Sequence, residues 1–216
     1  MVERIACGGV NCYIVGVPGA CTLVDTATEK YSERLRARAE ELGVRVIVIT
    51  HCHYDHAGGA AKLSSSLGVP IAMHPADIPL MTDPGCFRMR ADTLSGRIML
   101  RMRGRHPRRK VTPFSPTIDP SGGLDFAAYG GAGEAVMLPG HTPGSIGVLY
   151  DGCLIAGDAV YNIFAPCRSK FYCDGDEAGY SYRRILADDR VSVVYPGHGR
   201  PIVLNKNKPM LTPVTE

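Results

Sequence analysis

The stretch VIVITHCHYDHAGGAA, residues 46–61, constrains this chain more than any other. An apolar, β-branched run typical of a strand buried on both faces leads directly into three histidines and an aspartate within six positions. In an extended segment alternate side chains share a face, so His51 and His53 point the same way and Cys52 points into the core. Asp55 and His56 follow where the chain turns toward the next helix. Clustered imidazoles repel each other when protonated, and a metal ion removes that conflict.

Three further coordinating residues follow apolar runs that each end in glycine. VMLPG leads into His141, LIAG into Asp158 and VVYPG into His198. Glycine allows a sharp turn, so we expect these runs to be strands that deliver ligands to one rim of the fold. Neither His74 nor His106 belongs to a ligand-spaced cluster, and both are predicted to be surface or turn residues.

The composition is that of a globular protein, with 45% hydrophobic and 21% charged residues among 216. We expect one domain over residues 1–216. The N-terminal residues do not form a secretory signal and no apolar run is long enough to cross a bilayer, so a cytoplasmic location is expected. The eight cysteines contain no Cys-x-x-Cys pair; we interpret them as small buried hydrophobes, with a disulfide as the alternative.

Strands and helices are expected to alternate along most of the chain. The N-terminal half predicts strands at 11–17, 21–25, 44–50 and 70–74, with helices at about 28–42 and 57–67. The C-terminal half predicts strands at 124–130, 134–140, 145–151, 153–158 and 191–197, with a helix at about 176–188.

A basic excursion at about 84–116 interrupts this alternation. Nine basic residues and only Asp92 lie between Arg88 and Lys110, a local net charge of +8 that leaves −5 for the rest of the chain. Ala91, Leu94, Ile98 and Met102 are spaced three or four apart and predict a helix with one apolar stripe. The segment could be a docked helix with a solvated charged face, a lid for an anionic substrate, a contact with a second subunit, or a nucleic-acid site. No aromatic residues alternate with the arginines, which disfavours nucleic acid.

Taken together, these residues resemble the metallo-β-lactamase fold hydrolases. His51, His53, Asp55 and His56 match the family's His-x-His-x-Asp-His motif; His141, Asp158 and His198 match its later ligands, and Asp25 matches an aspartate beneath the metal site. The resemblance implies an α/β (α+β) fold, the four-layer αββα sandwich with two mixed β-sheets flanked by helices. It also implies that His51, His53 and His141 hold one metal, that Asp55, His56 and His198 hold a second, and that Asp158 bridges them.

Such a centre is expected to hold two divalent ions, zinc by default, with iron or manganese as alternatives. Two ions about 3.5–4 Å apart lower the pKa of a shared water and supply hydroxide at neutral pH. Asp55 is the candidate for orienting that nucleophile and handling its proton, and Asp158 for bridging the ions. We therefore predict a metallo-hydrolase.

The substrate is predicted from a second resemblance. KFYCDGDE after Asp158 is similar to glyoxalase II, the hydroxyacylglutathione thioesterase of this family, and implies that Lys170 and Tyr172 bind substrate. Eighteen residues follow His198, too few for the C-terminal helical domain of the long glyoxalase II enzymes, so a short thioesterase is expected. A lactonase, a phosphodiesterase and a mono-iron persulfide dioxygenase are the alternatives. The expected partner is a small, possibly anionic substrate. No membrane is expected, nucleic acid is disfavoured, and a homo-oligomer is left open.

Overall fold

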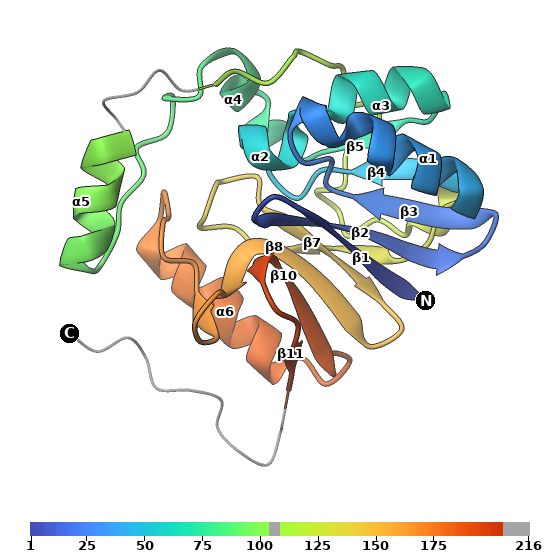
Figure 1. The fold of residues 1–216 in the computed structure, drawn as a ribbon. Helices are drawn as coiled ribbons and strands as arrows, with labels where there is room; N and C mark the ends of the chain where they lie inside the picture. Colours follow the sequence, from blue (N-terminus) through green and yellow to red (C-terminus); the bar gives the residue numbers. More distant parts are fainter. Residues whose placement is uncertain (104–108, 205–216) are drawn as a thin grey trace.

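The computed structural model describes residues 1–103 and 109–204, and it contains two β-sheets stacked face to face (Figure 1). The strands of the first sheet occur in chain order, β1-β2-β3-β4-β5. β1 to β3 pair antiparallel, whereas β3, β4 and β5 run parallel. The bounds are Val2–Cys7 (β1), Val10–Val17 (β2), Ala20–Val24 (β3), Val44–Val48 (β4) and Ile71–Ala72 (β5).

The second sheet has the order β11-β10-β8-β7-β6, with β9 paired to β8. β10 runs parallel to β8, and the other pairs are antiparallel. Both sheets are therefore mixed. The bounds are Glu134–Met137 (β6), Ile146–Tyr150 (β7), Cys153–Asn162 (β8), Cys167–Arg168 (β9), Val193–Gly199 (β10) and Ile202–Val203 (β11).

Helices cover the outer face of each sheet, which produces the expected four layers (Figure 1). Leu35 of α1 and Leu63 of α3 pack with Ile14 and Ile47 of the first sheet, and Ile185 of α6 packs with Leu154 of the second. A third cluster, which includes Val46, Phe126 and Ile155, fills the space between the sheets. The helices are Ser32–Leu42 (α1), Tyr54–Ala57 (α2), Ala60–Leu67 (α3), Pro79–Thr82 (α4), Leu94–Arg103 (α5) and Gly175–Ala187 (α6).

The strand predicted at 124–130 is wrong. Residues Phe126–Tyr129 form a 3-10 helix instead. The Asp125 carboxylate accepts a hydrogen bond from the Ala127 N–H, and Gly130 ends the helix at φ 75°. Phe126 is fully buried between the sheets, so its apolar character reflects packing rather than strand periodicity. Strands β1, β9 and β11 were not predicted. β9 and β11 are only two residues long, and β1 carries the charged side chains of Glu3 and Arg4.

The apolar stripe predicted in the basic segment does lie on a helix, α5, but it does not pack on the core. Leu94, Ile98 and Met102 are exposed, and only Ala91, just before the helix, is buried. The interpretation as a helix docked by this stripe is therefore wrong. His74 begins a turn as predicted, and its Nδ1 accepts from the Ala76 N–H. His106 lies outside the described residues.

The cysteines follow the prediction only in part. Cys7, Cys12, Cys21 and Cys52 are buried, Cys86 is exposed, and all eight are free thiols. Cys52 points into the first-sheet core, as the alternation of the opening motif predicts. No helix within residues 1–103 and 109–204 is long and apolar enough to cross a membrane.

Candidate metal centre

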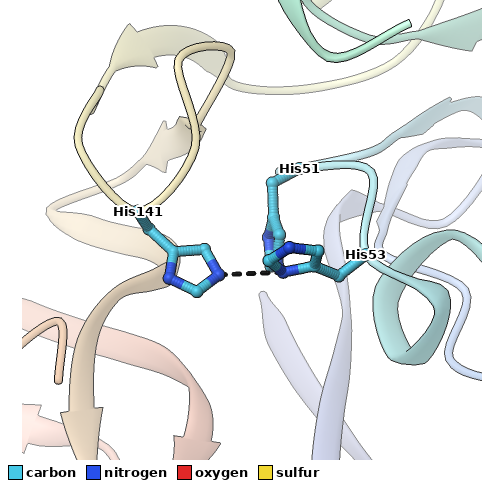
Figure 2. A group of neighbouring side chains, drawn as sticks. All are labelled: His51, His53 and His141. Carbon is cyan, nitrogen blue, oxygen red and sulfur yellow. Dashed lines mark hydrogen bonds between the residues drawn. The ribbon is translucent and has the colours of Figure 1, made fainter. Parts of the chain in front are cut away.

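Seven histidine and aspartate side chains converge at one edge of the two sheets, and they come from both halves of the chain. Figure 2 shows the rings of His51, His53 and His141 turned toward one another across this edge. Three overlapping groups each bring their nitrogen and oxygen atoms within 4.8 Å of one another: His51–His53–His141, His51–His56–Asp158 and Asp55–His56–His198. The structure thus brings together every residue that the sequence proposed as a metal ligand.

The first group contains only imidazoles. His141 Nε2 lies 3.0 Å from His53 Nδ1, and the His51 ring centroid lies 4.7 Å from that of His53 and 4.6 Å from that of His141. Two lone pairs facing each other at 3.0 Å repel unless a proton or a cation lies between them. Neutral imidazoles arranged in this way are the donors that zinc, iron and related ions take up.

The second group adds a carboxylate. His198 Nε2 lies 3.5 Å from Asp55 Oδ2 and 3.4 Å from His56 Nε2. His56 is fully buried, whereas the Asp55 side chain is 40% exposed. Asp55 is therefore the most accessible carboxylate of the centre and can meet a substrate or a water from outside.

Asp158 lies between the two groups. Its Oδ1 is 3.3 Å from His56 Nε2 and 3.5 Å from His198 Nε2, while its Oδ2 is 3.6 Å from His141 Nε2. One carboxylate thus reaches both groups with different oxygens, the arrangement needed for a bridging ligand.

The predicted positions of Asp158 and His198 relative to their strands need correction. Both residues lie within strands, β8 and β10, rather than after them. The pairing of β8 with β10 shifts register at Tyr195–Pro196 and again before His198, and Gly157 takes φ 51°. These irregularities let the strands continue while turning the two ligating side chains to the rim.

Asp25 fixes the imidazoles from beneath. Its Oδ2 lies 2.7 Å from His56 Nδ1 and accepts from the Thr50 hydroxyl at 2.8 Å, while its Oδ1 accepts from the Thr50 N–H. Because the Thr50 proton goes to Asp25, the Thr50 oxygen is left to accept from His51 Nδ1, 3.1 Å away. Both imidazoles then carry their proton on Nδ1 and turn an Nε2 lone pair toward the centre.

Backbone carbonyls do the same for His141 and His198. His141 Nδ1 donates to Phe171 C=O at 2.6 Å, and His198 Nδ1 donates to Gly9 C=O at 2.6 Å. These two carbonyls and the Thr50 hydroxyl were not predicted. Every residue has a backbone carbonyl, so residue type does not reveal which carbonyl orients a histidine.

Two atoms of the centre are buried without a hydrogen-bond partner: His51 Nε2 and Asp158 Oδ1. Leaving a buried acceptor unsatisfied is costly, and native structures usually supply a partner. Both atoms are electron-pair donors aimed into the same cluster. The donor set, the orientation of the lone pairs and these two atoms therefore all fit bound divalent cations.

The electrostatics of the centre favour the neutral imidazole that a metal requires at three of its five histidines. Burial lowers the pKa of His51 and of His141, and burial together with His141 lowers the pKa of His53 to about 3. These three imidazoles are neutral at pH 7. Burial opposes charge at His56 and His198 too, but Asp158 together with Asp25 at His56, and with Asp55 at His198, outweighs burial and raises the pKa of both.

The carboxylates respond in the opposite sense. Burial would raise the pKa of Asp158 and Asp55, yet the neighbouring histidines outweigh burial and hold both pKa values below the usual range. A cation bound here would replace the protons of His56 and His198 as the partner of these carboxylates.

Tyr161 supports Asp158 and was not predicted. Its hydroxyl donates to Asp158 Oδ2 at 2.6 Å, and its ring stacks on His198 at 5.6 Å and 8°. Tyr161 itself is buried. On a regular strand, side chains three residues apart point to opposite faces. Tyr161 reaches Asp158 because the strand is irregular here, as the register shifts between β8 and β10 show.

Asp77 anchors the loops that carry the imidazoles. This buried carboxylate accepts from the Cys52 N–H, the Thr142 hydroxyl and the Gly144 N–H, at 2.8–2.9 Å. It therefore joins the His51–His53 loop to the loop that follows His141. Burial raises the pKa of Asp77.

The two predicted substrate-binding residues lie in the loop between β9 and α6. Lys170 is exposed. Tyr172 is buried, its hydroxyl donates to Asp92, and Arg168 lies 5.3 Å over its ring. The Tyr172 hydroxyl is thus hydrogen-bonded to Asp92 of the basic segment. Its neighbour Phe171 accepts the hydrogen bond from His141, so this loop connects the basic segment to the centre.

The chain belongs to the metallo-beta-lactamase superfamily, whose family model matches residues 5–198. That range includes all seven converging side chains. The fold is that of this superfamily, and its relatives include probable metallo-hydrolases.

Individual relatives are similar at low identity. The probable metallo-hydrolase YflN of Bacillus subtilis is 28% identical over 160 residues, which cover 68% of this chain and 54% of YflN. A hydroxyacylglutathione hydrolase of Anaeromyxobacter dehalogenans is 27% identical over 149 residues, covering 69% of this chain and 45% of that enzyme. The chain thus spans about half the length of these two relatives. The crystal structure of TTHA1623 in a di-iron-bound form superposes with a TM-score of 0.66 at 22% identity and covers 96% of both chains.

Proposed function

We propose that this protein is a metal-dependent hydrolase that uses two divalent cations to cleave a thioester or a related acyl substrate. The convergence of seven nitrogen and oxygen donors at one rim, with two buried atoms that lack a hydrogen-bond partner, carries the proposal. The metallo-hydrolase relatives support its general class. Zinc is the proposed metal, and the di-iron form of TTHA1623 makes iron the main alternative.

Bound cations would be held by His51, His53 and His141 on one side and by Asp55, His56 and His198 on the other, with Asp158 between them. They would supply hydroxide at neutral pH and polarise the substrate oxygen. The chain's own residues supply the orientation. Asp25, Thr50, Phe171 C=O and Gly9 C=O hold four of the five imidazole rings, all but that of His53, so that the same nitrogens face the centre.

Asp55 is the proposed residue for orienting the attacking water and accepting its proton. Its side chain is partly exposed at the mouth of the centre, and the neighbouring histidines keep it ionised. A carboxylate in this state can accept a hydrogen bond from water and later return a proton to the leaving group.

The acyl substrate is proposed from the hydroxyacylglutathione hydrolase relative and from Lys170. The exposed Lys170 is available to bind a carboxylate of the leaving group. Because the Tyr172 hydroxyl is already hydrogen-bonded to Asp92, we assign Tyr172 the role of holding this loop, and Lys170 the direct contact.

The proposal is tested by measuring metal content and activity on the same sample. Protein purified without added metal is analysed by atomic emission, then assayed against thioesters, lactones, β-lactams and phosphodiesters. We expect about two equivalents of zinc per chain and the highest kcat/KM on a thioester. One equivalent of iron with oxygen uptake on a persulfide would replace this proposal by an oxygenase, and a preference for lactones or phosphodiesters would reassign the substrate. The expected cytoplasmic location stays a prediction from the sequence.

A further inference from the structure

Helix α5 presents an apolar face to solvent. Leu94 is 73% exposed, Ile98 50%, Met99 47% and Met102 61%. In an α-helix these positions share one side, so the four side chains form a continuous patch. Exposed apolar patches of a few hundred Å² on folded proteins usually mark interaction sites.

The opposite side of α5 holds the helix to its own chain. A Cβ on Gly96 would lie 2.8 Å from Ala91 Cβ and 3.7 Å from the Phe171 ring. Arg90 and Tyr172 exchange backbone hydrogen bonds, and Asp92 binds both the Tyr172 hydroxyl and Arg168. The helix is thus held in place from behind while its apolar face stays free, and Figure 1 shows it at the periphery, on the same side as α6.

Basic side chains flank the apolar patch. Arg97 and Arg101 are exposed on α5, and within the described part of the chain no carboxylate forms an ion pair with either. The single acid of the segment, Asp92, is already paired with Arg168. A partner for this face must therefore offer both apolar surface and negative charge.

The same chain offers such a surface on α6 and the adjoining β8–β9 turn. Tyr180 lies four residues after Asp176 and three after Glu177, so it adjoins both acids on the surface of α6. Tyr180 is 56% exposed, and Arg184 lies 5.7 Å over its ring. In the β8–β9 turn Ile163 is 55% and Phe164 is 93% exposed. Neither Asp176 nor Glu177 forms an ion pair with a described basic residue, so the acidic charge is available too.

We propose that two copies of this chain form a symmetric dimer in which α5 of each copy lies on α6 and the β8–β9 turn of the other. A two-fold dimer of this kind forms both contacts at once. A standard interface buries about 800 Å² per partner, more than one short helix face provides, and the reciprocal arrangement doubles the contact. The inference does not depend on the proposed function.

Other occupants explain less of this face. A nucleic-acid backbone would use the arginines but not four aliphatic side chains. An anionic lipid surface would use both, but the face carries no aromatic side chain of the kind enriched at membrane interfaces. A second copy accounts for the apolar patch and the arginines of α5 together with the acidic first turn of α6 and the exposed side chains of the β8–β9 turn.

The experiment is multi-angle light scattering of the full chain across micromolar concentrations. We expect the mass of two chains. Leu94→Ser/Ile98→Ser/Met102→Ser should weaken the dimer by at least about a hundredfold, because each truncated anchor costs on the order of 1 kcal/mol or more. The control Val17→Ser/Val203→Ser removes two exposed apolar side chains elsewhere and should leave the dimer intact. A monomeric wild type, or a dimer that survives the triple variant, would overturn the proposal.

Charge exchange identifies the receiving surface. Arg97→Glu/Arg101→Glu and Asp176→Arg/Glu177→Arg each place like charges across the proposed contact and should each be monomeric. Mixed together they should form a heterodimer, because each contact then joins opposite charges. No recovery on mixing would reject α6 as the acceptor. A monomer that sediments with phosphatidylserine vesicles would assign the face to a membrane instead.

Discussion

Asp25 Oδ2 lies 2.7 Å from His56 Nδ1, and Asp25 holds this position at φ 62°, a left-handed conformation that non-glycine residues seldom adopt. The carboxylate also accepts two hydrogen bonds from Thr50, which in turn faces His51. One buried carboxylate therefore orients imidazoles of both proposed metal groups. Strained backbone conformations of this kind persist where the surrounding contacts over-determine them.

Asp25→Asn should weaken metal binding while the fold is retained. Asparagine tolerates the left-handed conformation, but its neutral amide binds the His56 N–H less strongly than a carboxylate does. Removing such a supporting partner typically costs 10–100-fold in metal affinity or activity, so a loss of about that size is expected. Competition with a chromophoric chelator measures the affinity.

Asp151→Asn is the matched control for Asp25→Asn. Asp151 has a similar backbone conformation, φ 48°, but it is exposed in the β7–β8 turn. Its variant should bind metal as the wild type does. Equal affinities for all three proteins would show that Asp25 does not act on the metal groups.

Tyr161→Phe should lower turnover more than it lowers stability. The variant keeps the ring that stacks on His198 but loses the hydrogen bond to Asp158 Oδ2. Hydrogen bonds to charged groups contribute about 1.5–3 kcal/mol, so kcat/KM on the best substrate should fall by roughly tenfold or more. Tyr129→Phe changes an exposed tyrosine away from the centre and should leave kcat/KM unchanged. Unaltered kinetics in Tyr161→Phe would reject the supporting role.

Asp158→Ala should lose metal and activity together while the fold survives. The variant removes the carboxylate whose two oxygens reach both groups of histidines. Metal analysis, activity and circular dichroism on one preparation separate these effects. Full turnover in this variant would show that Asp158 does not bridge two ions.

Asp92→Asn tests whether the basic segment influences the centre. Asp92 binds Tyr172 and Arg168, and the adjacent Phe171 C=O accepts the proton of His141. Weakening this contact should loosen the Phe171 carbonyl and lower metal affinity by a few fold, a smaller effect than in Asp25→Asn. Glu29→Gln, at an exposed position on another face, is the control. A metal affinity equal to that of this control would separate the segment from the centre.

The fold and the convergence of the seven histidine and aspartate side chains could be predicted because both depend on residue type and spacing. Apolar runs that end in glycine located the strands, and histidine and aspartate are uncommon enough at such positions to mark the rim. The contacts that orient the ligands could not be predicted in the same way. Gly9 and Phe171 act through carbonyl groups, which every residue has, and Tyr161 reaches Asp158 only because β8 is irregular.

The error at residues 124–130 and the exposed stripe of α5 have a common cause. Sequence patterning states which side chains are apolar, but not what covers them. Phe126 is buried from a 3-10 helix between the sheets, whereas Leu94 and Ile98 are equally apolar and remain exposed. Whether an apolar side chain is buried depends on which elements pack against it in the folded chain. The apolar pattern of a single sequence does not predict that packing.

Gly157→Ala should destabilise the fold at the centre itself. A Cβ at Gly157 would lie 2.6 Å from Thr50 Oγ1, the hydroxyl that joins Asp25 to His51, and the residue has φ 51°. Gly19→Ala is the matched control, since Gly19 has φ 90° but an added Cβ would meet nothing within 4 Å. Both variants share the conformational cost of about 1 kcal/mol. Only Gly157→Ala adds overpacking, about 1–3 kcal/mol more. Urea unfolding of metal-free protein measures both values, and equal losses would show that Thr50 moves aside without cost.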